Sequence, residues 1–416
     1  MRLSSEKNKE NVKYMTDGIT HIIKTFEKRP PGSKGERDAQ NYMASDLEKY
    51  MDKVWTEDFE LHPGAFMGWI YITVACLLLA FTSFWLSRLA TLIFIVLAII
   101  PMITQLILYK EVYDPLFKKE TSVNVVSVKK PKGEVKRRVI LNGHADATWE
   151  WTILYKFGFG AFKAVFLISI IGVFYFLGLA IAGLIVIDNP LFILLPANQT
   201  ILILGAIGSI FVPFWIVLIW FSDEKTVVDG ANDNLTGCYV PMAVAKTLKE
   251  EGIELQNTEF MVVLSGSEEA GLRGAKRFAV KHKEDLSDVE TIIIPFETLR
   301  EKEHLSIFER DLNMTVATDR QLLALIKQAG RNVGTELQVG MVELGSTDAA
   351  AFTQAGFKSV CIGAMDHDLQ PYYHTRKDTY DNLDPETLGI SLDIALETVL
   401  LYDKEGLPAP LPKGTK

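Results

Sequence analysis

The sequence predicts an α/β domain interrupted by four membrane-spanning helices. Two observations carry this prediction. Short apolar segments of the kind that form strands alternate with segments whose apolar residues recur at helical spacing, which is the pattern of an α/β domain. Four apolar runs without charged residues, each of a length that could cross a bilayer, interrupt that alternation in two pairs.

Composition agrees with a protein that is partly soluble and partly in a membrane. Hydrophobic residues make up 48% of the chain, and the mean hydropathy of +0.15 is high for a soluble protein. The net charge is -9 and no long basic run is present, which argues against nucleic acid as a partner. Cys76, Cys238 and Cys361 form no CxxC pair, so we expect buried structural thiols in a reducing compartment.

The soluble domain is expected in three pieces, 1–62, 110–161 and 222–416, separated by transmembrane hairpins at 63–109 and 162–221. Apolar spacing predicts a helix over 35–52, and another is expected over 233–248. Strands are predicted at 54–61, 123–130, 138–144, 258–266, 291–297 and 358–364. Ligand sites of α/β domains lie beyond the carboxyl ends of the strands. Acids and histidines recur at those ends, which points to function there.

The apolar runs predict four membrane spans. They cover 64–86, 89–109 and 164–187, followed by a turn at 188–190 and a fourth run that ends near 221. Aromatic residues typical of membrane interfaces lie near several ends: Trp69, Trp85, Tyr109 and Trp220.

The charge distribution predicts which side of the membrane the soluble domain occupies. An even number of spans places all soluble segments on one side. The far-side loops carry one arginine, Arg88, and the near-side flanks carry Lys110, Lys118, Lys119, Lys156, Lys163 and Lys225. The charged segment 1–15 does not resemble a signal peptide. By the positive-inside rule we expect a multi-pass protein whose soluble domain faces the cytoplasm.

The first candidate site residues close the strand predicted at 138–144. His144 and Asp146 are two positions apart, and residues so spaced share one face of a strand. Asp146 could therefore orient the ring of His144. Taken alone, the pair is also what an ordinary hydrogen-bonded histidine looks like.

Two further acidic segments follow along the chain. Asp233 lies in the sequence DGANDN, where it could cap a helix or bridge two cations. Glu268 and Glu269 follow the strand predicted at 258–266. Adjacent acids point in different directions, so one could bind a metal while the other takes a proton from a water molecule. A solvated acidic pair is the plainer alternative.

The remaining candidates are spread over the second half of the chain. Glu297 ends a predicted strand, Asp348 precedes a helix start, and Tyr373 and His374 lie in a polar loop. Each position has an ordinary explanation, but the ordered set does not. Mixed nitrogen and oxygen ligands suit Zn²⁺, with Co²⁺ or Mn²⁺ possible. Two cations sharing a carboxylate would activate a water and stabilise an oxyanion.

The motifs together resemble one enzyme family. Arg29-Pro30-Pro31-Gly32-Ser33, the HxD of 144–146, the GAxDN of 230–234, the EExGLxG of 268–274 and the YHTxxD of 373–378 occur in the order seen in di-zinc metallopeptidases. That family contains the bacterial leucine aminopeptidases, aminopeptidase Y and glutamate carboxypeptidase, with glutaminyl cyclase as a relative. The resemblance implies a zinc aminopeptidase-like fold, in which a mixed, mostly parallel sheet is flanked by helices.

The resemblance also implies roles for individual residues. His144 and Glu297 would bind one zinc, Glu269 and His374 the other, and Asp233 would bridge them. Glu268 would act as the general base and then as the acid. Asp146 and Asp348 match positions that support the ligands, and Tyr373 would either support the ligands or contact the substrate. The sequence departs from the family in two places. Glu297 stands where the family usually has Asp, and the family's Ser-Asp-His pattern reads Ser346-Thr347-Asp348 here, with no histidine after the aspartate.

We therefore expect a membrane-anchored zinc peptidase, most simply an aminopeptidase. An N-acyl amino acid amidohydrolase or carboxypeptidase could use the same metals, and would need a cation such as Arg300, Arg310 or Arg376 for the substrate carboxylate. Glutaminyl cyclase activity is less expected, because those relatives usually keep one zinc. A catalytically silent scaffold is also less expected, because it would have lost Glu268 or several ligands. The second hairpin lies between His144 and Asp233 in the sequence, so we expect the active-site mouth to face the bilayer and to take amphipathic substrates.

Overall fold

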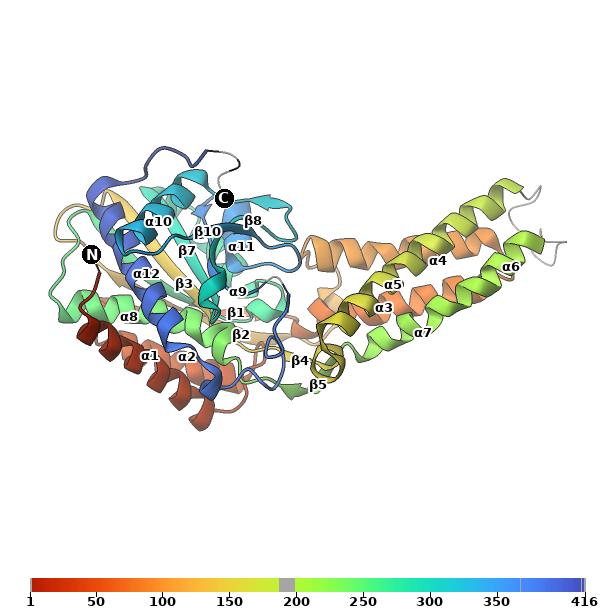
Figure 1. Cartoon of the computed structure of the whole chain (residues 1–416), viewed down its shortest axis with the longest axis horizontal. Helices are drawn as coiled ribbons and strands as arrows, with labels where there is room; N and C mark the ends of the chain where they lie inside the picture. The colour runs from red at the N-terminus through yellow and green to blue at the C-terminus, as the bar shows by residue number, and fades with distance from the viewer. Residues whose placement is uncertain (1, 187–198, 367, 413, 415–416) are drawn as a thin grey trace. The chain divides into compact units, whose positions relative to one another are not determined.

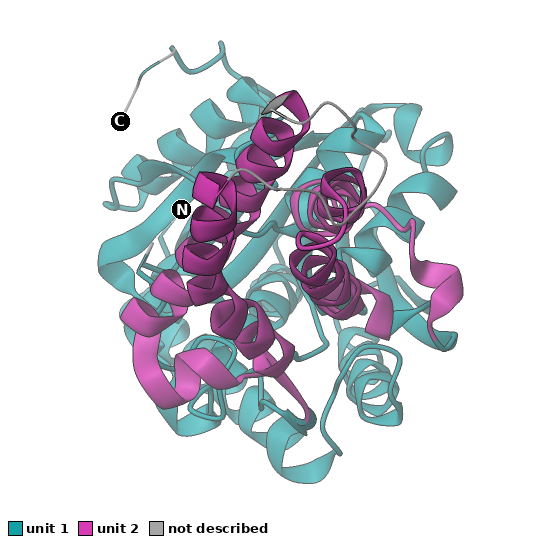
Figure 2. Cartoon of the chain, turned by 90° about the vertical axis from the view of Figure 1, so that its right-hand side faces the viewer, with its two compact units in different colours: residues 1–63, 118–149, 225–416 teal, residues 64–117, 150–224 magenta. Residues whose placement is uncertain are grey.

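The computed structural model describes residues 2–186, 199–366, 368–412 and 414. The chain divides into two compact units, which Figure 2 distinguishes by colour. Unit 1 comprises Met1–Pro63, Lys118–Trp149 and Lys225–Lys416, and unit 2 comprises Gly64–Phe117 and Glu150–Glu224.

Unit 1 is built on a ten-stranded mixed sheet with the order β1-β2-β6-β3-β7-β12-β8-β10, in which β11 also pairs with β7 and β9 with β8 (Figure 1). The strands are β1 Lys53–Leu61, β2 Glu120–Lys129, β3 Arg137–His144, β6 Thr258–Ser265, β7 Glu290–Leu299, β8 Leu305–Asp311, β9 Val316–Ala317, β10 Gln338–Met341, β11 Lys358–Ser359 and β12 Ile362–Ala364. The central strands β6, β3, β7 and β12 run parallel, whereas β1 with β2, β2 with β6 and β12 with β8 are antiparallel.

Helices pack on the sheet, because successive side chains of each strand point to opposite faces and supply apolar contacts. Val139 and Leu141 of β3 lie in the main hydrophobic core, while Ile140 between them points to the opposite face, as the two-residue period of a strand requires. The main core is formed with α1 Ser5–Thr25, α2 Lys34–Leu47, α8 Thr236–Glu250, α10 Arg320–Asn332 and α12 Pro385–Glu405. Helices α9 Arg273–Lys281 and α11 Asp348–Ala355 pack against each other and against β2 and β7. The predicted α/β fold with a mixed sheet flanked by helices is confirmed.

Three predicted elements differ in detail. The helix predicted over 35–52 ends at Leu47. The strand predicted at 358–364 is divided into β11, which pairs with β7, and β12, which lies between β7 and β8. The helix predicted over 233–248 begins only at Thr236, because Ala231–Leu235 form a π-type turn in which Asp233 and Asn234 leave helical dihedral angles. The irregular backbone at 231–235 lies at the carboxyl edge of the sheet, whereas the break at 360–361 lies opposite the middle of β7.

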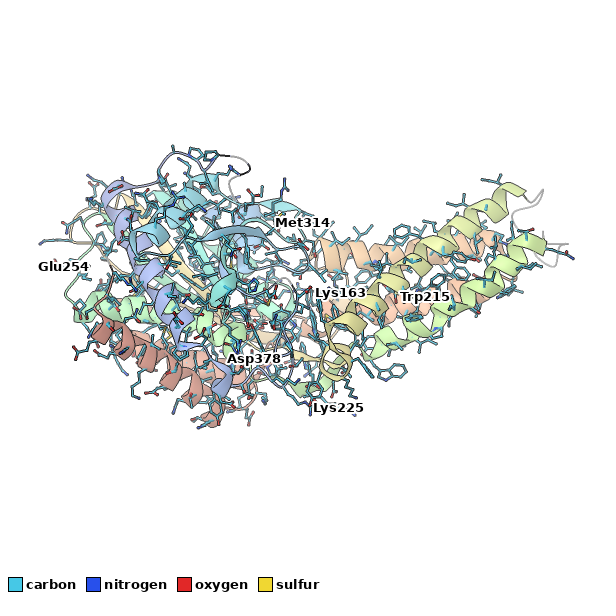
Figure 3. All side chains as sticks on the ribbon, in the orientation of Figure 1. Lys163, Trp215, Lys225, Glu254, Met314 and Asp378 are labelled. Carbon is cyan, nitrogen blue, oxygen red and sulfur yellow. The ribbon has the colours of Figure 1, made fainter. Side chains whose placement is uncertain are left out.

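Among the described residues, four helical segments, all in unit 2 apart from Pro63, are long and apolar enough to cross a membrane by length and composition: Pro63–Ser83, Arg88–Ile107, Thr152–Ile185 and Gln199–Trp220. They comprise α3 Pro63–Ser83, α4 Arg88–Pro101 with the π-helical Met102–Ile107, α5 Thr152–Val186, and α6 Gln199–Gly208 with α7 Val212–Val217. The predicted turn at 188–190 lies outside the described residues. Trp215, labelled in Figure 3, is fully buried and donates from Nε1 to the Ser169 carbonyl over 3.0 Å.

The limits of unit 2 are wider than the hairpins expected from hydropathy. Residues 110–117 belong to it because the ring of Phe117 occupies the space where a side chain on Gly68 would lie. Residues 150–161 also belong to it, because α5 begins at Thr152, bends at Gly158 and brings Trp151 into a stack on Phe162, with ring centroids 5.3 Å apart. The chain passes between the units beside β4 Trp149–Trp151 and β5 Ser222–Val227, which form a separate two-stranded sheet.

Candidate active site

Three parallel strands bring the candidate residues to one edge of the sheet. His144 ends β3, Glu297 lies near the end of β7, and Glu268 and Glu269 follow β6 in a short turn. The register aligns these ends, since His144 pairs with Ser265 of β6. The polar residues that follow the buried apolar strands therefore gather at one edge of the sheet.

Asp233 reaches the same edge because β3 and α8 approach unusually closely. A side chain built on Gly143 would lie 2.2 Å from the backbone of Gly237. Only glycine leaves room for this contact. The close approach brings Asp233 Oδ1 within 3.3 Å of His144 Nε2.

The predicted ligands gather into three overlapping groups. His144 with Asp233 and Glu297 forms one, Asp233 with Glu269 and His374 a second, and His144 with Glu268 and Glu269 a third, each with its ligand atoms within 4.8 Å of one another. His144 Nε2 lies 3.5 Å from Glu297 Oε1 and 3.8 Å from Glu268 Oε2. Asp233 belongs to two of the groups and lies between the two histidines.

The electrostatics of this cluster favour bound positive charge. Burial raises the pKa of Glu268 well above its usual range and that of Glu297 to about 8. Burial would lower the pKa of the histidines, but the nearby carboxylates outweigh it, with Glu297 and Glu268 raising that of His144 and Glu269 raising that of His374 to about 10. Burial opposes ionisation of Asp233 as well, yet its contacts with both histidines lower its pKa.

The donor atoms fit a metal pair. Within the described part of the chain, Asp233 Oδ2 and Glu269 Oε1 are buried and receive no hydrogen bond. They face His374 Nε2 at 2.9 and 3.2 Å. One ring nitrogen cannot satisfy both oxygens with a single proton, whereas a cation placed among the three atoms would satisfy all of them. The mixture of imidazole nitrogen and carboxylate oxygen is the set that zinc prefers.

Comparison with known proteins agrees with this geometry. The sequence model of Peptidase family M28 matches residues 215–399. Over those residues the chain is similar to the peptidases of family M28. The M28 match includes the predicted positions from Asp233 to His374, while His144 and Asp146 precede it. The resemblance drawn from the motifs is thereby confirmed, as is the predicted class of metallopeptidase.

Solved structures share the fold over nearly the whole chain. An aminopeptidase from Aneurinibacillus sp. strain AM-1 superposes with a TM-score of 0.58 at 13% identity, covering 99% of both chains. A zinc aminopeptidase from Bacillus subtilis gives 0.55 at 14% identity, covering 94% of this chain and 95% of that one. A glutaminyl cyclase from Bacteroides thetaiotaomicron gives 0.52 at 14% identity, with coverage of 96% and 98%. At these identities the likeness concerns the fold. A sequence search of curated proteins finds no match.

Asp146 supports the M28 site in a way that the sequence predicted only in part. Its Oδ1 lies 3.3 Å from His144 Nδ1, the contact expected from the HxD spacing. The same carboxylate also accepts hydrogen bonds from the backbone N–H groups of Glu268 at 2.9 Å and Glu269 at 3.0 Å. Asp146 thus links a ligand on β3 to the acidic pair after β6.

Asp348 and Tyr373 lie beside the ligands. Asp348 is buried at the start of α11, accepts a hydrogen bond from the Ser265 hydroxyl, and has its pKa raised to about 6, mainly by burial. Tyr373 stacks on His374 with ring centroids 4.0 Å apart. The glutamate at 297 is held by its own neighbours, because Asn234 Nδ2 donates to its Oε2 over 3.2 Å.

Sequence reasoning missed Asp378, which is labelled in Figure 3. This buried carboxylate accepts hydrogen bonds from Asn232 N at 2.9 Å, Asn232 Nδ2 at 2.8 Å and Asp233 N at 3.1 Å. It therefore fixes the turn that carries Asp233, whose peptide bond to Asn234 is cis. The only signal was its place in the YHTxxD motif, four residues after His374.

Arg29, in the RPPGS segment, was also given no role from the sequence. Its buried guanidinium donates from Nε to the Ala145 carbonyl at 2.8 Å, and from Nη2 to the carbonyls of Asp229 at 2.7 Å and Gly230 at 3.1 Å. Val228 N also bonds to Thr148 O at 3.0 Å. Arg29 thus joins the segments on either side of the second insertion, next to His144 and Asp233.

Proposed function

We propose that the protein is a membrane-anchored, zinc-dependent peptidase that hydrolyses peptide bonds, most simply as an aminopeptidase. The single observation that carries the proposal is the overlap of the three ligand groups at Asp233 and His144. Such an overlap suits two cations that share a carboxylate, rather than one isolated ion.

The proposed ligands divide between two zinc ions. His144 and Glu297 would hold one, Glu269 and His374 the other, and Asp233 would contact both. A zinc pair at this position would supply Lewis acidity, polarising the scissile carbonyl and making a nearby water more acidic. Co²⁺ or Mn²⁺ could occupy the same nitrogen and oxygen ligands.

Glu268 is proposed as the group that moves the proton. It takes a proton from the attacking water and passes it to the leaving amine. The raised pKa of its carboxyl suits this exchange, and Asp146 holds its backbone N–H at 2.9 Å. Asp348 and Tyr373 would orient the ligands or the substrate.

The test is metal analysis of the detergent-purified protein, combined with hydrolysis of amino-acid amides, dipeptides and N-acyl amino acids. We expect about two zinc ions per chain, and Glu268→Gln should lower kcat by at least about hundredfold while it keeps the metal. Glu284→Gln, at an exposed position of the same charge, is the control. Absence of both metal and turnover in the wild type would instead favour a membrane scaffold.

A second candidate function has one specific observation in its favour. A surface pocket of about 520 Å³ is lined by Arg300, Arg376 and Lys377, together with Tyr372. Tyr372 lies two residues before His374 in the chain. A cationic pocket in this segment suits a substrate with a free carboxylate, as carboxypeptidases and N-acyl amino acid amidohydrolases require. Arg310, also considered from the sequence, does not line it.

The substrate panel separates these two functions. An aminopeptidase would hydrolyse amides that lack a carboxylate, and Arg376→Gln would leave that rate unchanged. A carboxypeptidase or amidohydrolase would require the carboxylate, and Arg376→Gln would raise its KM.

Membrane anchoring is proposed from the four apolar segments of unit 2. The soluble unit would then lie on the cytoplasmic side, with the active-site mouth toward the bilayer. Amphipathic peptides or lipidated amino acids are the corresponding substrates. Replacing residues 149–227 with a short soluble turn should reduce hydrolysis of such substrates, and unchanged activity would contradict the membrane-facing mouth.

A further inference from the structure

Glu36 is a fully buried carboxylate of α2 that lies far from the ligands in sequence. Its Oε1 accepts hydrogen bonds from Ser267 N at 2.6 Å and Ser267 Oγ at 3.0 Å. Its Oε2 accepts from Gly32 N at 2.7 Å and Ser122 Oγ at 2.9 Å. One side chain thus joins the RPPGS segment, β2 and the turn after β6.

The sequence around Glu36 suggests a plainer role, which the structure does not bear out. Ser33 and Glu36 have the spacing of a capping box, in which the glutamate returns to the backbone N–H of the capping serine. The first half is present, since Ser33 Oγ accepts from Glu36 N at 3.1 Å. The second half is not, because Ser33 N bonds to Pro30 O at 3.0 Å. The Glu36 carboxylate is therefore directed to the turn at Ser267.

That turn has an uncommon backbone conformation. Ser267, with φ of +54°, lies in the left-handed region that residues other than glycine rarely adopt. Such a conformation persists where the surroundings over-determine it. Here Glu36 holds the Ser267 N–H and hydroxyl, and Asp146 holds the N–H groups of Glu268 and Glu269. Three consecutive N–H groups are bound by two buried carboxylates.

We propose that Glu36 is a positioning residue that fixes the orientation of Glu268 through Ser267. The proposal rests on the proposed function, in which Glu268 moves the proton. Each oxygen of Glu36 faces one backbone N–H. A glutamine at this position would direct its NH₂ group at one of those donors, whichever way the amide turned. The site therefore requires a carboxylate and not merely a polar side chain of this size.

The test compares Glu36→Gln with Asp46→Asn in the full-length, zinc-loaded protein. Asp46 is a matched control, because it is a buried carboxylate of the same helix that accepts from Tyr14 and Lys49 and contacts none of the turn. We expect Glu36→Gln to lower kcat about tenfold or more with KM changed less than about twofold and zinc content retained. Asp46→Asn should keep the wild-type kcat. Equal kcat values for the two variants would overturn the proposal.

Amide hydrogen exchange supplies a readout that does not depend on activity. Followed by mass spectrometry in the metal-free protein, exchange at residues 267–269 should be faster in Glu36→Gln than in Asp46→Asn. If the wild type hydrolyses nothing, the proposed function fails, and the exchange comparison still decides the role of Glu36. Unchanged exchange at 267–269 would contradict it.

A milder variant covers the case in which Glu36→Gln does not fold. Ser122→Ala removes one of the four donors and leaves the carboxylate in place. We expect a two- to fivefold fall in kcat, about the effect of one lost hydrogen bond, and modestly faster exchange at Ser267. Wild-type kcat and exchange in this variant would count against the proposal.

Discussion

At the scale of single residues, the site depends on carboxylates that are buried or, in the case of Glu297, mostly buried. Some of them face the histidines, as Asp233 and Glu297 do. Others, such as Asp146 and Asp378, accept hydrogen bonds from backbone N–H groups and so shape the turns that carry the ligands. A buried carboxylate that loses one acceptor leaves a backbone donor unsatisfied, which costs more than the hydrogen bond alone.

Asp378→Asn tests this second kind of carboxylate. An amide keeps one oxygen and directs an NH₂ group at the backbone of Asn232 or Asp233, which are donors themselves. We expect a loss of about 1–3 kcal/mol in the free energy of unfolding of the soluble unit. Urea denaturation and zinc titration measure the effect, and Asp381→Asn, at an exposed position nearby, is the control. Equal stability of the two variants would contradict the role given to Asp378.

The residues proposed to bind metal were easier to single out from sequence than those that support them. His144, Glu269 and His374 belong to motifs whose types and order point to a metal. Glu36 and Asp378 act on partners 231 and 145 positions away in the chain. No local pattern distinguishes such a carboxylate from a helix cap or a solvated acid, because its role lies in what the fold brings beside it.

At the scale of elements, close backbone contacts decide where the ligands meet. Gly143, one residue before the end of β3, lies against Gly237 near the start of α8, and Gly237 in turn lies against the Phe296 carbonyl of β7. The two strands that carry His144 and Glu297 and the helix that follows Asp233 are therefore in contact through two residues without side chains.

Gly143→Ala should separate these elements. A methyl group 2.2 Å from the Gly237 backbone forces β3 and α8 apart, and backbone cannot yield as a flexible side chain would. We expect destabilisation of more than about 2 kcal/mol and weaker zinc binding. Gly340→Ala is the matched control, because it is also a strand glycine but its added methyl group would meet its nearest neighbour at an ordinary 3.4 Å. Thermal unfolding with and without zinc compares them, and equal melting temperatures would refute the expectation.

The predicted strands and helices were largely found, because runs such as 138–144 and 291–297 are apolar enough to be buried on both faces. The exceptions have physical causes. Residues 358–364 form two short strands that both pair with β7, and only β12 pairs with β8 as well. The turn at 231–235 is held by hydrogen bonds that Asp233 N and Asn234 Nδ2 donate to Asp378 and to the Phe296 carbonyl. Hydropathy alone also placed the start of the third apolar helix too late, since Thr152 to Lys163 include charged and glycine residues.

At the scale of the whole molecule, the metal-free protein should lose stability as pH rises. Burial raises the pKa of Glu297 to about 8 and that of Asp378 to about 7, above the values near 4 of an unfolded chain. Groups with a raised folded pKa contribute stability that is present below their unfolded pKa and lost as pH rises through the folded value. The stability that these two groups contribute should therefore be lost between about pH 4 and pH 8.

Chelation should consequently matter more at high pH. Bound zinc favours the ionised carboxylates and removes their penalty, so the fall in melting temperature on adding a chelator should be larger at pH 8 than at pH 5.5. Scanning calorimetry of the detergent-purified protein measures this, with zinc restored as the control. An equal fall at both pH values would mean that the buried carboxylates do not respond to the metal.

The proposed topology predicts where added cysteines can be labelled. Leu86, 56% exposed between the first two apolar segments, should lie on the far side, and Lys225, after the fourth, on the cytoplasmic side. In intact cells an impermeant maleimide should label Leu86→Cys, and should label Lys225→Cys only after lysis. The wild type, whose Cys238 and Cys361 are buried, gives the background. The opposite labelling pattern would reverse the assigned orientation.

The strand order has a consequence for biogenesis. β1 pairs with β2 across the first insertion, and β3 pairs with β6 and β7 across the second. On the proposed topology, the ribosome has delivered both hairpins to the translocon before β6 and β7 are synthesised. The sheet cannot close, and its ligands cannot meet, until that has happened. Proteolytic capacity would thus arise only after both hairpins have left the site of synthesis.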